Sequence, residues 1–215
     1  MRKKRSVRVK RRTLPAMRPV RPRALPKHLA RLLDDEGWGM EVQWSGHRRL
    51  FYIESGRCWV ESKTGKVEER FHPLCEDVAS ELSGVHDAIL DGAIIAPDEH
   101  GHPVLRGAAK KGATLIVMAV DLLWLNGEDL RPLPLVERQE KLKFILPARA
   151  DAVHVLQSDM VAGEEEKKDF LHNLDHAGLG GFVLKRLDGA YARGAWYQVK
   201  RSQQPVQQPK LRGAA

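Results

Sequence analysis

The sequence predicts an α+β domain whose sheets are antiparallel, and three observations favour this class. Short segments rich in β-branched and aromatic residues recur along the chain, and turn-forming pairs such as Ser55-Gly56 separate them. Three segments with helical periodicity are inserted into this strand-rich order. Hydrophobic residues make up 42% of the 215 residues, enough for a sizeable core, and no internal repeat is visible.

The first half of the body is predicted to contain four strands and one helix. Segments 39–44, 49–54 and 57–62 alternate well enough to form a three-stranded meander. The turns between and after them are pairs that end in glycine: Ser45-Gly46, Ser55-Gly56 and Thr64-Gly65. A helix is predicted over 72–84, because Pro73 lies near its start and Gly84 at its end. Segment 87–97 then reads as a strand, followed by a polar loop.

The second half of the body continues this pattern. The apolar run 114–125 suits a buried strand that ends at Asn126-Gly127. A helix is predicted over 133–146, with Leu135, Leu142 and Ile145 on one side. The other predicted elements are a strand at 151–157, a helix at 164–178 with Glu–Lys pairs, and two late strands at 181–187 and 195–200.

The positive charge of the chain is concentrated at its start. Residues 1–27 hold 12 Lys or Arg and no Asp or Glu, whereas the rest carries 24 basic and 28 acidic residues. The same segment contains four prolines, so we expect a disordered arm over 1–27, a body over 28–201 and a disordered Gln/Pro-rich tail over 202–215. A basic arm gains salt-dependent affinity for phosphate backbones, and the alternatives are a solubilising tail or a contact with acidic proteins. The candidate nucleic-acid-binding residues are Arg2, Lys3, Lys4, Arg5, Arg8, Lys10, Arg11 and Arg12.

Composition also bounds the setting of the protein. No stretch approaches the eighteen or so apolar residues of a membrane span, so we expect no membrane partner. The Arg-rich start resembles a transit peptide, but its prolines oppose the amphipathic helix of such peptides. Cys58 and Cys75 are the only cysteines; two cysteines make no zinc module and nothing indicates an oxidising compartment. We therefore expect a cytoplasmic, nucleoid-associated protein.

No residue or short motif, taken by itself, predicts an enzyme. His172 and His176 have the spacing of a metal pair on a helix, but no third ligand is near in sequence, and we predict no metal site. Lys110-Lys111 reads as a solvated basic turn. The GLGG run at 178–181 follows a predicted helix rather than preceding one, so its glycines are expected to end the helix and not to bind a phosphate. No paired carboxylates and no Ser/His/Asp signature are present.

The order of the segments is more informative than any one of them. The blocks EVQWSGHR, SKTG, LDGAIIAPDEHGHP, AVDLLWLNGEDLRPLPLVERQEKL, GLGGFVLKR and WYQVK follow one another over 28–201. In this order they resemble the adenylation (nucleotidyltransferase) domain of ATP-dependent DNA ligases, and most of all the bacterial end-joining type. The resemblance implies an ATP-grasp-like nucleotidyltransferase domain with antiparallel sheets flanked by helices. Family members carry an OB-fold after the last block, and the 14 residues after Arg201 are too few for one, so we expect no OB-fold.

The resemblance also shows where this chain departs from the family. The first family block reads Glu-x-Lys-x-Asp-Gly-x-Arg, and its lysine attacks the α-phosphate of ATP. An amide nitrogen lacks a free lone pair and cannot replace that amine. The other changed positions are a second acid in the first block, a glutamate of the third, a glutamate of the fourth and a lysine of the fifth. The degenerate positions are Gln43, Ser45, Ala93, Gly180 and Gln198.

Other positions match the family or stay apolar. The family resemblance implies nucleotide contacts at Glu41, Arg48, Lys185 and Lys200, and at Val120, where the family has an aromatic ring over adenine. It also implies ATP and Mg²⁺ as family cofactors and DNA nicks or ends as substrates. We therefore predict a catalytically degenerate ligase-like monomer, a pseudo-ligase, that binds DNA through its arm in DNA repair or end joining. An active ligase or an end-joining protein is its expected partner.

Three alternatives stay open on the sequence. A different lysine, of which Lys63 is the nearest in sequence, would keep the protein an active nucleotidyltransferase. A second alternative is that the chain is a non-catalytic protein-interaction module. RNA ligases and capping enzymes share the same plan, so RNA is a further candidate ligand.

Overall fold

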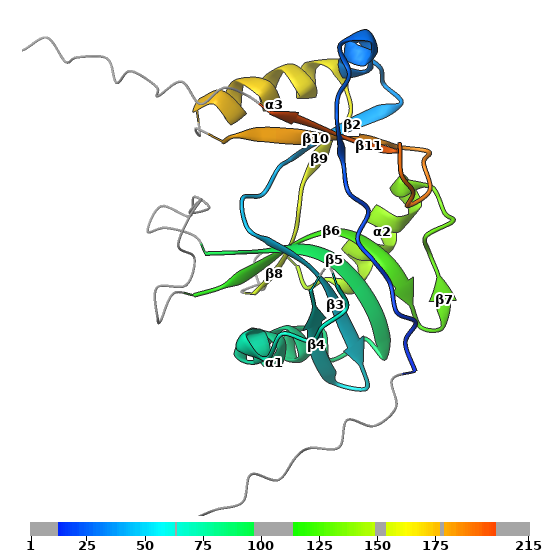
Figure 1. Ribbon diagram of the computed structural model, residues 1–215, viewed down its shortest axis with the longest axis vertical. Coiled ribbons are helices and arrows are strands. Elements are labelled where there is room, and N and C mark those ends of the chain that lie inside the picture. Colours follow the sequence, from blue (N-terminus) through cyan, green and yellow to red (C-terminus); the bar gives the residue numbers. More distant parts are fainter. Residues whose placement is uncertain (1–12, 63, 97–113, 149–153, 177–178, 201–215) are drawn as a thin grey trace, which may run out of the picture.

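The computed structural model describes residues 13–62, 64–96, 114–148, 154–176 and 179–200, and these residues form two sheets, one above the other in Figure 1. The first sheet has the order β1-β11-β10-β2-β9, and the second has the order β4-β3-β5-β6-β7, with β8 paired to β6. The strands of the first sheet are β1 (Arg23–Ala24), β2 (Trp38–Val42), β9 (Met160–Val161), β10 (Gly181–Arg186) and β11 (Trp196–Lys200). Those of the second are β3 (His47–Glu54), β4 (Arg57–Glu61), β5 (Asp87–Ile95), β6 (Ile116–Leu125), β7 (Glu128–Asp129) and β8 (Val155–Gln157).

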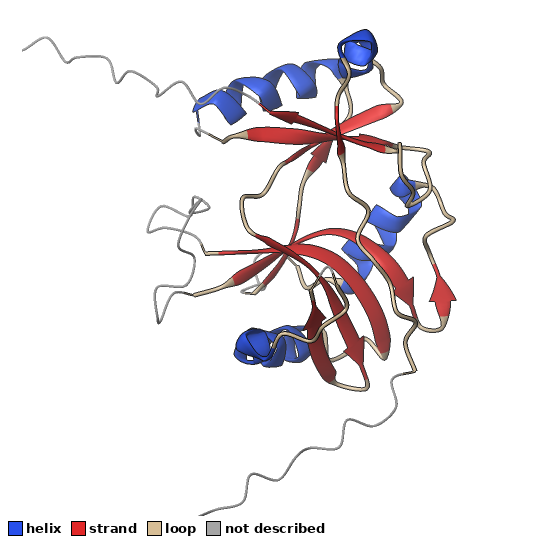
Figure 2. Cartoon of the chain, in the orientation of Figure 1, coloured by secondary structure: helices blue, strands red, loops and turns tan. Residues whose placement is uncertain are grey.

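The three α-helices are α1 (His72–Glu81), α2 (Leu135–Ile145) and α3 (Glu164–His176), with two short 3₁₀ helices, η1 (Lys27–Leu33) and η2 (Glu69–Phe71). α3 lies on the outer face of the first sheet and α1 on that of the second, whereas α2 lies beside β6 (Figure 2). The pairings are antiparallel except for β1 with β11 and β6 with β8. The predicted α+β class with antiparallel sheets is therefore confirmed. None of the described helices is long and apolar enough to cross a membrane.

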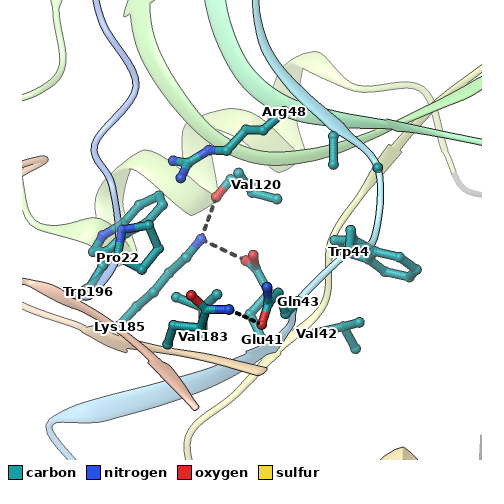
Figure 3. A pocket seen from close by; sticks show the side chains of 13 residues that line it. Pro22, Glu41, Val42, Gln43, Trp44, Arg48, Val120, Val183, Lys185 and Trp196 are labelled. Atoms are coloured by element: carbon teal, nitrogen blue, oxygen red, sulfur yellow. Dashed lines mark hydrogen bonds and ion pairs between the residues drawn. The ribbon is translucent and has the colours of Figure 1, made fainter. Parts of the chain in front are cut away.

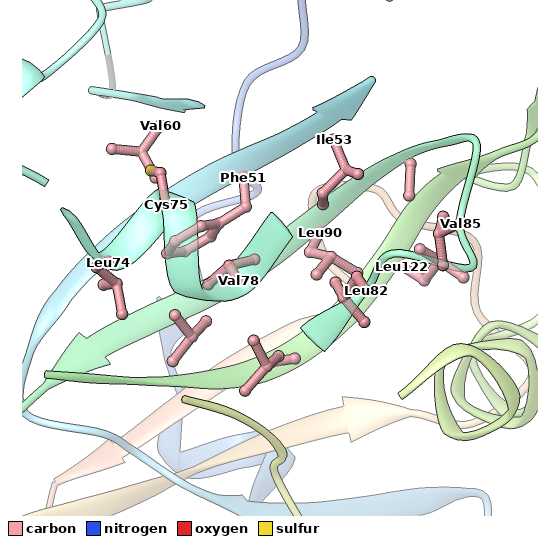
Figure 4. Packing of buried hydrophobic residues seen from close by; sticks show 14 of the residues in the cluster. Phe51, Ile53, Val60, Leu74, Cys75, Val78, Leu82, Val85, Leu90 and Leu122 are labelled. Carbon is pink, nitrogen blue, oxygen red and sulfur yellow. The ribbon is translucent and has the colours of Figure 1, made fainter. Parts of the chain in front are cut away.

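Strand β3 contributes side chains to two hydrophobic clusters. Its residues Leu50, Phe51, Tyr52 and Ile53 are all buried, and successive side chains of a strand point to opposite faces. Phe51 and Ile53 belong to the cluster between the second sheet and α1 (Figure 4), whereas Leu50 and Tyr52 belong to the cluster between the two sheets. A side chain of this kind contributes about 1.5–3 kcal/mol when fully buried. Residues 50–53 of the strand are thus all apolar because both faces of the strand are covered there.

The predicted meander of three strands is wrong in its first member. β3 and β4 form the expected hairpin around Ser55-Gly56, but β2 pairs with β10 and β9 in the other sheet. Ser45-Gly46 is therefore part of a linker that crosses between the sheets and not a hairpin turn. A side-chain carbon at Gly46 would lie 2.2 Å from the carbonyl oxygen of Ile94, so only glycine permits this close approach.

The predicted disordered arm over 1–27 also needs correction from residue 13 onward. Leu14 and Met17 are buried in the cluster between the sheets, and Arg23–Ala24 pairs with β11. The Met17 amide donates to the Tyr52 hydroxyl at 3.0 Å, and the Thr13 amide donates to Glu54. Residues 13–22, which we call the strap, thus run across both sheets (Figure 1). Residues 1–12, with all eight predicted nucleic-acid contacts, and residues 201–215 lie outside the described residues.

The remaining predicted elements are confirmed at their expected places. The helices at 72–84, 133–146 and 164–178 correspond to α1, α2 and α3, and Leu135 and Leu142 are buried. The run 114–125 forms β6, which turns at Asn126-Gly127 with positive φ at both residues. The loop after β5, with Lys110-Lys111, lies outside the described residues.

Candidate functional site

A cavity of about 270 Å³ lies between the two sheets, beside the linker that joins β2 to β3 (Figure 3). Seven residues that the sequence singled out line it: Glu41, Gln43, Arg48, Ala93, Val120, Lys185 and Gln198. The other lining residues, which sequence reasoning missed, are Pro22, Val42, Trp44, Gly46, Val183 and Trp196. Blocks that are far apart in sequence therefore converge on one cavity.

A buried ion pair forms one wall of the cavity. Lys185 Nζ donates to Glu41 Oε2 at 2.9 Å and to the carbonyl oxygen of Val120 at 2.9 Å, as Figure 3 shows. The same nitrogen lies 4.1 Å from the centroid of the Trp196 ring. Both charged side chains are at most 2% exposed. Burial raises the pKa of Glu41 to about 7, although Lys185 acts in the opposite direction.

A second ion pair holds Arg48. Its Nε and Nη2 donate to the two carboxylate oxygens of Asp91 at 2.9 and 2.5 Å, and its Nη1 donates to the Val20 carbonyl of the strap at 2.7 Å. Burial opposes the charge, but Asp91 raises the pKa of Arg48 above its ordinary value. The Tyr191 hydroxyl donates to Asp91 at 2.5 Å and accepts from the Val20 amide at 2.9 Å. The strap is therefore bonded to the charged wall of the cavity.

Two degenerate positions contact each other directly. Gln198 Nε2 donates to Gln43 Oε1 at 2.8 Å, which joins β11 to the end of β2. The resemblance places a lysine at both positions in the family. Two amide side chains satisfy each other here, whereas two neighbouring ammonium groups would repel each other unless an anion lay between them.

Helix α2 supports the floor of the cavity. Arg138 Nε and Nη2 donate to the two oxygens of Asp121, each at 2.9 Å, and Gln139 donates to the Val120 carbonyl at 2.9 Å. The Val120 carbonyl is the same group that accepts from Lys185. Burial raises the pKa of Asp121 even though Arg138 lowers it. The position of Lys185 thus depends on a helix that does not itself line the cavity.

The structure leaves other predicted residues outside the cavity. Ser45 lies in the crossing linker, and Gly180 directly precedes β10. Lys200, at the end of β11, is exposed and does not line the cavity. The alternative nucleophile Lys63 lies outside the described residues. Among residues 13–62, 64–96, 114–148, 154–176 and 179–200, no group of three metal-ligating side chains forms, and the rings of His172 and His176 lie 4.3 Å apart without a third ligand.

Some of the missed lining residues could have been found from the sequence, and others could not. Trp44 belongs to the quoted first block, and its indole Nε1 donates to the Ser158 hydroxyl at 2.8 Å, which ties two crossing linkers together. Trp196 begins the last block, and its ring lies under both Lys185 and Arg48. Both tryptophans follow or precede chemically singled-out positions, so proximity in sequence could have found them. Nothing in the Arg/Pro-rich start pointed to Pro22.

Comparison with known proteins agrees with the arrangement of these blocks. The family described as ATP dependent DNA ligase domain matches residues 23–203. The multifunctional non-homologous end joining protein LigD of Mycolicibacterium smegmatis is 27% identical over 182 residues, which cover 80% of this chain and 23% of LigD. DNA ligase C1 of the same organism is 30% identical over 206 residues, covering 87% of this chain and 57% of that protein. The chain thus spans about a quarter of LigD.

Solved structures show the same fold. A mycobacterial DNA ligase D complexed with ATP and MES has a TM-score of 0.67 and 22% identity, covering 86% of this chain and 60% of that one. The ligase domain of Mycobacterium tuberculosis LigD has a TM-score of 0.64 and 23% identity, covering 76% of this chain and 53% of that one. The predicted nucleotidyltransferase fold of DNA ligases is therefore confirmed.

Proposed function

Because this chain belongs to the ATP-dependent DNA ligase domain family, we propose that it is a DNA-binding member that no longer attaches AMP to itself. The observation that carries this proposal is the hydrogen bond between Gln43 and Gln198. These two glutamines stand at positions where the family pattern has lysines. In this proposal the protein is a cytoplasmic, nucleoid-associated monomer that assists an active ligase or an end-joining protein in DNA repair.

The chemistry of the cavity supports the loss of self-adenylation. The amide nitrogen of Gln43 shares its lone pair with the carbonyl group and is not a nucleophile. Lys185 is the only amine among the described residues that line the cavity. Its Nζ donates to Glu41 and Val120 and faces the Trp196 ring, so it would have to break these contacts before it could attack a phosphate in line.

The cavity also does not fit a divalent metal ion. Mg²⁺ prefers carboxylate oxygens as protein ligands, and the family's acidic positions are Ala93 and Gly180 here. The carboxylates of Glu41 and Asp91 already accept from Lys185 and Arg48. Any nucleotide that binds would therefore meet cations that are already paired.

Incubation with ATP labelled at the α-phosphate tests the catalytic part. We expect no protein-bound label with Mg²⁺ or Mn²⁺, because no free amine faces the cavity among the described lining residues. The ligase domain of a LigD relative serves as the positive control under the same conditions. A label on the wild-type chain, located on a lysine by peptide mass spectrometry, would refute the proposal; loss of that label in Lys185→Met would identify the replacement nucleophile.

Deletion of residues 1–12 tests the DNA-binding part. These residues hold eight Lys or Arg, and each phosphate contact contributes about 0.9 to the slope of log K against log salt concentration. We expect the deletion to weaken binding to nicked and blunt duplexes and to reduce that slope by up to about 7. The measurement is fluorescence anisotropy over a salt series, with an RNA duplex as the competing ligand.

A longer deletion that also removes the strap, residues 13–22, provides the matched control. Deletion of residues 1–12 should leave the Tm unchanged, whereas deletion of 1–22 removes the buried Leu14 and Met17 and should lower it. Equal binding and equal salt slope with and without residues 1–12 would rule out the arm as the DNA contact. Absence of binding at low salt would favour the protein-interaction alternative.

A further inference from the structure

The two cysteines of the chain lie together at the edge of the second sheet. Cys58 is on the edge strand β4, and Cys75 is on α1, which packs against that strand. Cys75 is 4% exposed in the apolar cluster of Figure 4, and Cys58 is partly exposed and packs against the same cluster. Both side chains face the layer between β4 and α1, although residues 59–74 separate them in sequence. A disulfide between them would therefore require only local movement of two elements that already pack against each other.

Solvent reaches this pair through a groove. Cys58 and Cys75 both line a surface groove of about 570 Å³, together with His72, Glu76 and Ser80. Cys75 lies in the first turn of α1, near the positive end of the helix dipole, which favours a thiolate. The neighbouring Cys58 thiol lowers the pKa of Cys75, whereas the neighbouring Cys75 thiol and burial raise the pKa of Cys58. The two thiols therefore have different roles.

We propose that Cys58 and Cys75 form a reversible dithiol–disulfide site that reacts with small organic disulfides. The Cys75 thiolate attacks one sulfur of the organic disulfide, forms a mixed disulfide and releases one thiolate. Cys58 then loses its proton to solvent and attacks the Cys75 sulfur, which expels the second thiolate. The protein gives up two electrons and two protons, and the organic disulfide becomes two thiols. This site lies apart from the cavity between the sheets and does not depend on the proposed DNA function.

The disulfide would join α1 covalently to the edge strand. It would close the loop between residues 58 and 75 and so reduce the entropy of the unfolded chain. For a loop of this length and a protein of this size, we expect the Tm to rise by about 6–12 °C on oxidation. Reduction by dithiothreitol should reverse that rise.

The test uses the full chain, first reduced and then treated with glutathione disulfide. We expect the intact mass to fall by two hydrogens, and an alkylating reagent to label both cysteines before treatment and neither after it. Cys58→Ser should stop at a mixed disulfide on Cys75, and Cys75→Ser should react at least about tenfold more slowly. Circular dichroism of the reduced variants establishes that they are folded.

The wild-type chain alone is sufficient to overturn the proposal. Two alkylated cysteines after treatment, a mixed disulfide that persists, or a dimer linked through cysteine would each contradict an internal disulfide. An unchanged Tm after complete oxidation would contradict the link between α1 and the edge strand.

Discussion

Replacing Arg138 by methionine is expected to lower the free energy of unfolding by about 3–5 kcal/mol, because the change leaves a buried carboxylate without its partner. The side chains of Arg138 and Asp121 are both fully buried, and two hydrogen bonds of 2.9 Å join them. Arg138 Nη1 also donates to the carbonyl oxygens of Leu133 and Gly189. Urea unfolding followed by circular dichroism measures the loss.

Two further variants test whether the loss of stability comes from the unpaired Asp121 carboxylate. The double variant Asp121→Leu with Arg138→Met removes both charges, and we expect most of the stability to return. Arg131→Met breaks an ion pair with Asp129 that is 42% and 35% exposed, and its effect should stay below about 1 kcal/mol. A loss below about 1 kcal/mol for Arg138→Met alone would contradict the importance of this pair.

The consequence of this pair reaches the cavity. Arg138 holds α2 on β6, and the next residue, Gln139, bonds the Val120 carbonyl to which Lys185 also donates. A looser α2 would therefore displace the Val120 carbonyl that accepts from Lys185, although Arg138 itself does not line the cavity. Nucleotide binding that is weakened in Arg138→Met and restored in the double variant would demonstrate this indirect support.

Local patterns predicted the elements of this fold well. The four consecutive apolar residues of β3 and the helical spacing of Leu135 and Leu142 depend only on which faces are buried. The turns at Ser55-Gly56 and Asn126-Gly127 need positive φ, which glycine and asparagine favour. Such signals lie within a few residues of one another, so a single sequence contains them.

Strand partners and the strap could not be predicted in the same way. β2 and β3 are adjacent in sequence and both have the composition of strands, but this composition does not say which sheet a strand joins. The reason for the crossing, the close approach of Gly46 to Ile94, involves residues 48 positions apart. Leu14 and Met17 are two apolar residues without periodicity in a segment of arginines and prolines. Their burial depends on a gap between sheets that only the fold creates.

The candidate site shows the same division. The resemblance to DNA ligases identified Gln43 and Gln198 as separate departures, and the fold shows that they bond to each other although 155 positions separate them. It also identified Glu41, Arg48 and Lys185 as retained. It did not show that Lys185 pairs with Glu41 or that Asp91 pairs with Arg48. Pairing of this kind depends on side-chain geometry, and it is the pairing that argues against catalysis.

Between about pH 4.5 and 7, the stability contributed by Glu41 is expected to fall as the pH rises. Burial raises the pKa of Glu41 from 4.5 to about 7, so the folded state keeps a proton that the unfolded chain has released. The contribution is fully present below pH 4.5 and is lost once the pH passes 7. A change of this size corresponds to about 3 kcal/mol.

The difference in unfolding free energy between the wild type and Glu41→Gln isolates this effect, because the other titrating groups are common to both proteins. We expect the difference to change by about 3 kcal/mol across that interval and to stay constant above pH 8. Glu68→Gln is the matched control of opposite sign. Burial raises the pKa of Glu68, but hydrogen bonds from Arg49 and Arg70 lower it overall, so its contribution is lost as the pH falls.

A difference for Glu41→Gln that stays constant from pH 4.5 to 8 would mean that Lys185 fully offsets the burial of the carboxylate. In that case the Glu41 carboxylate would not titrate with the raised pKa, and the charge of the cavity would not change as the pH passes 7. The expected slope implies instead that the cavity loses a negative charge as the pH falls through 7, because Glu41 takes up a proton. The same titration therefore decides which charge a bound anion would meet.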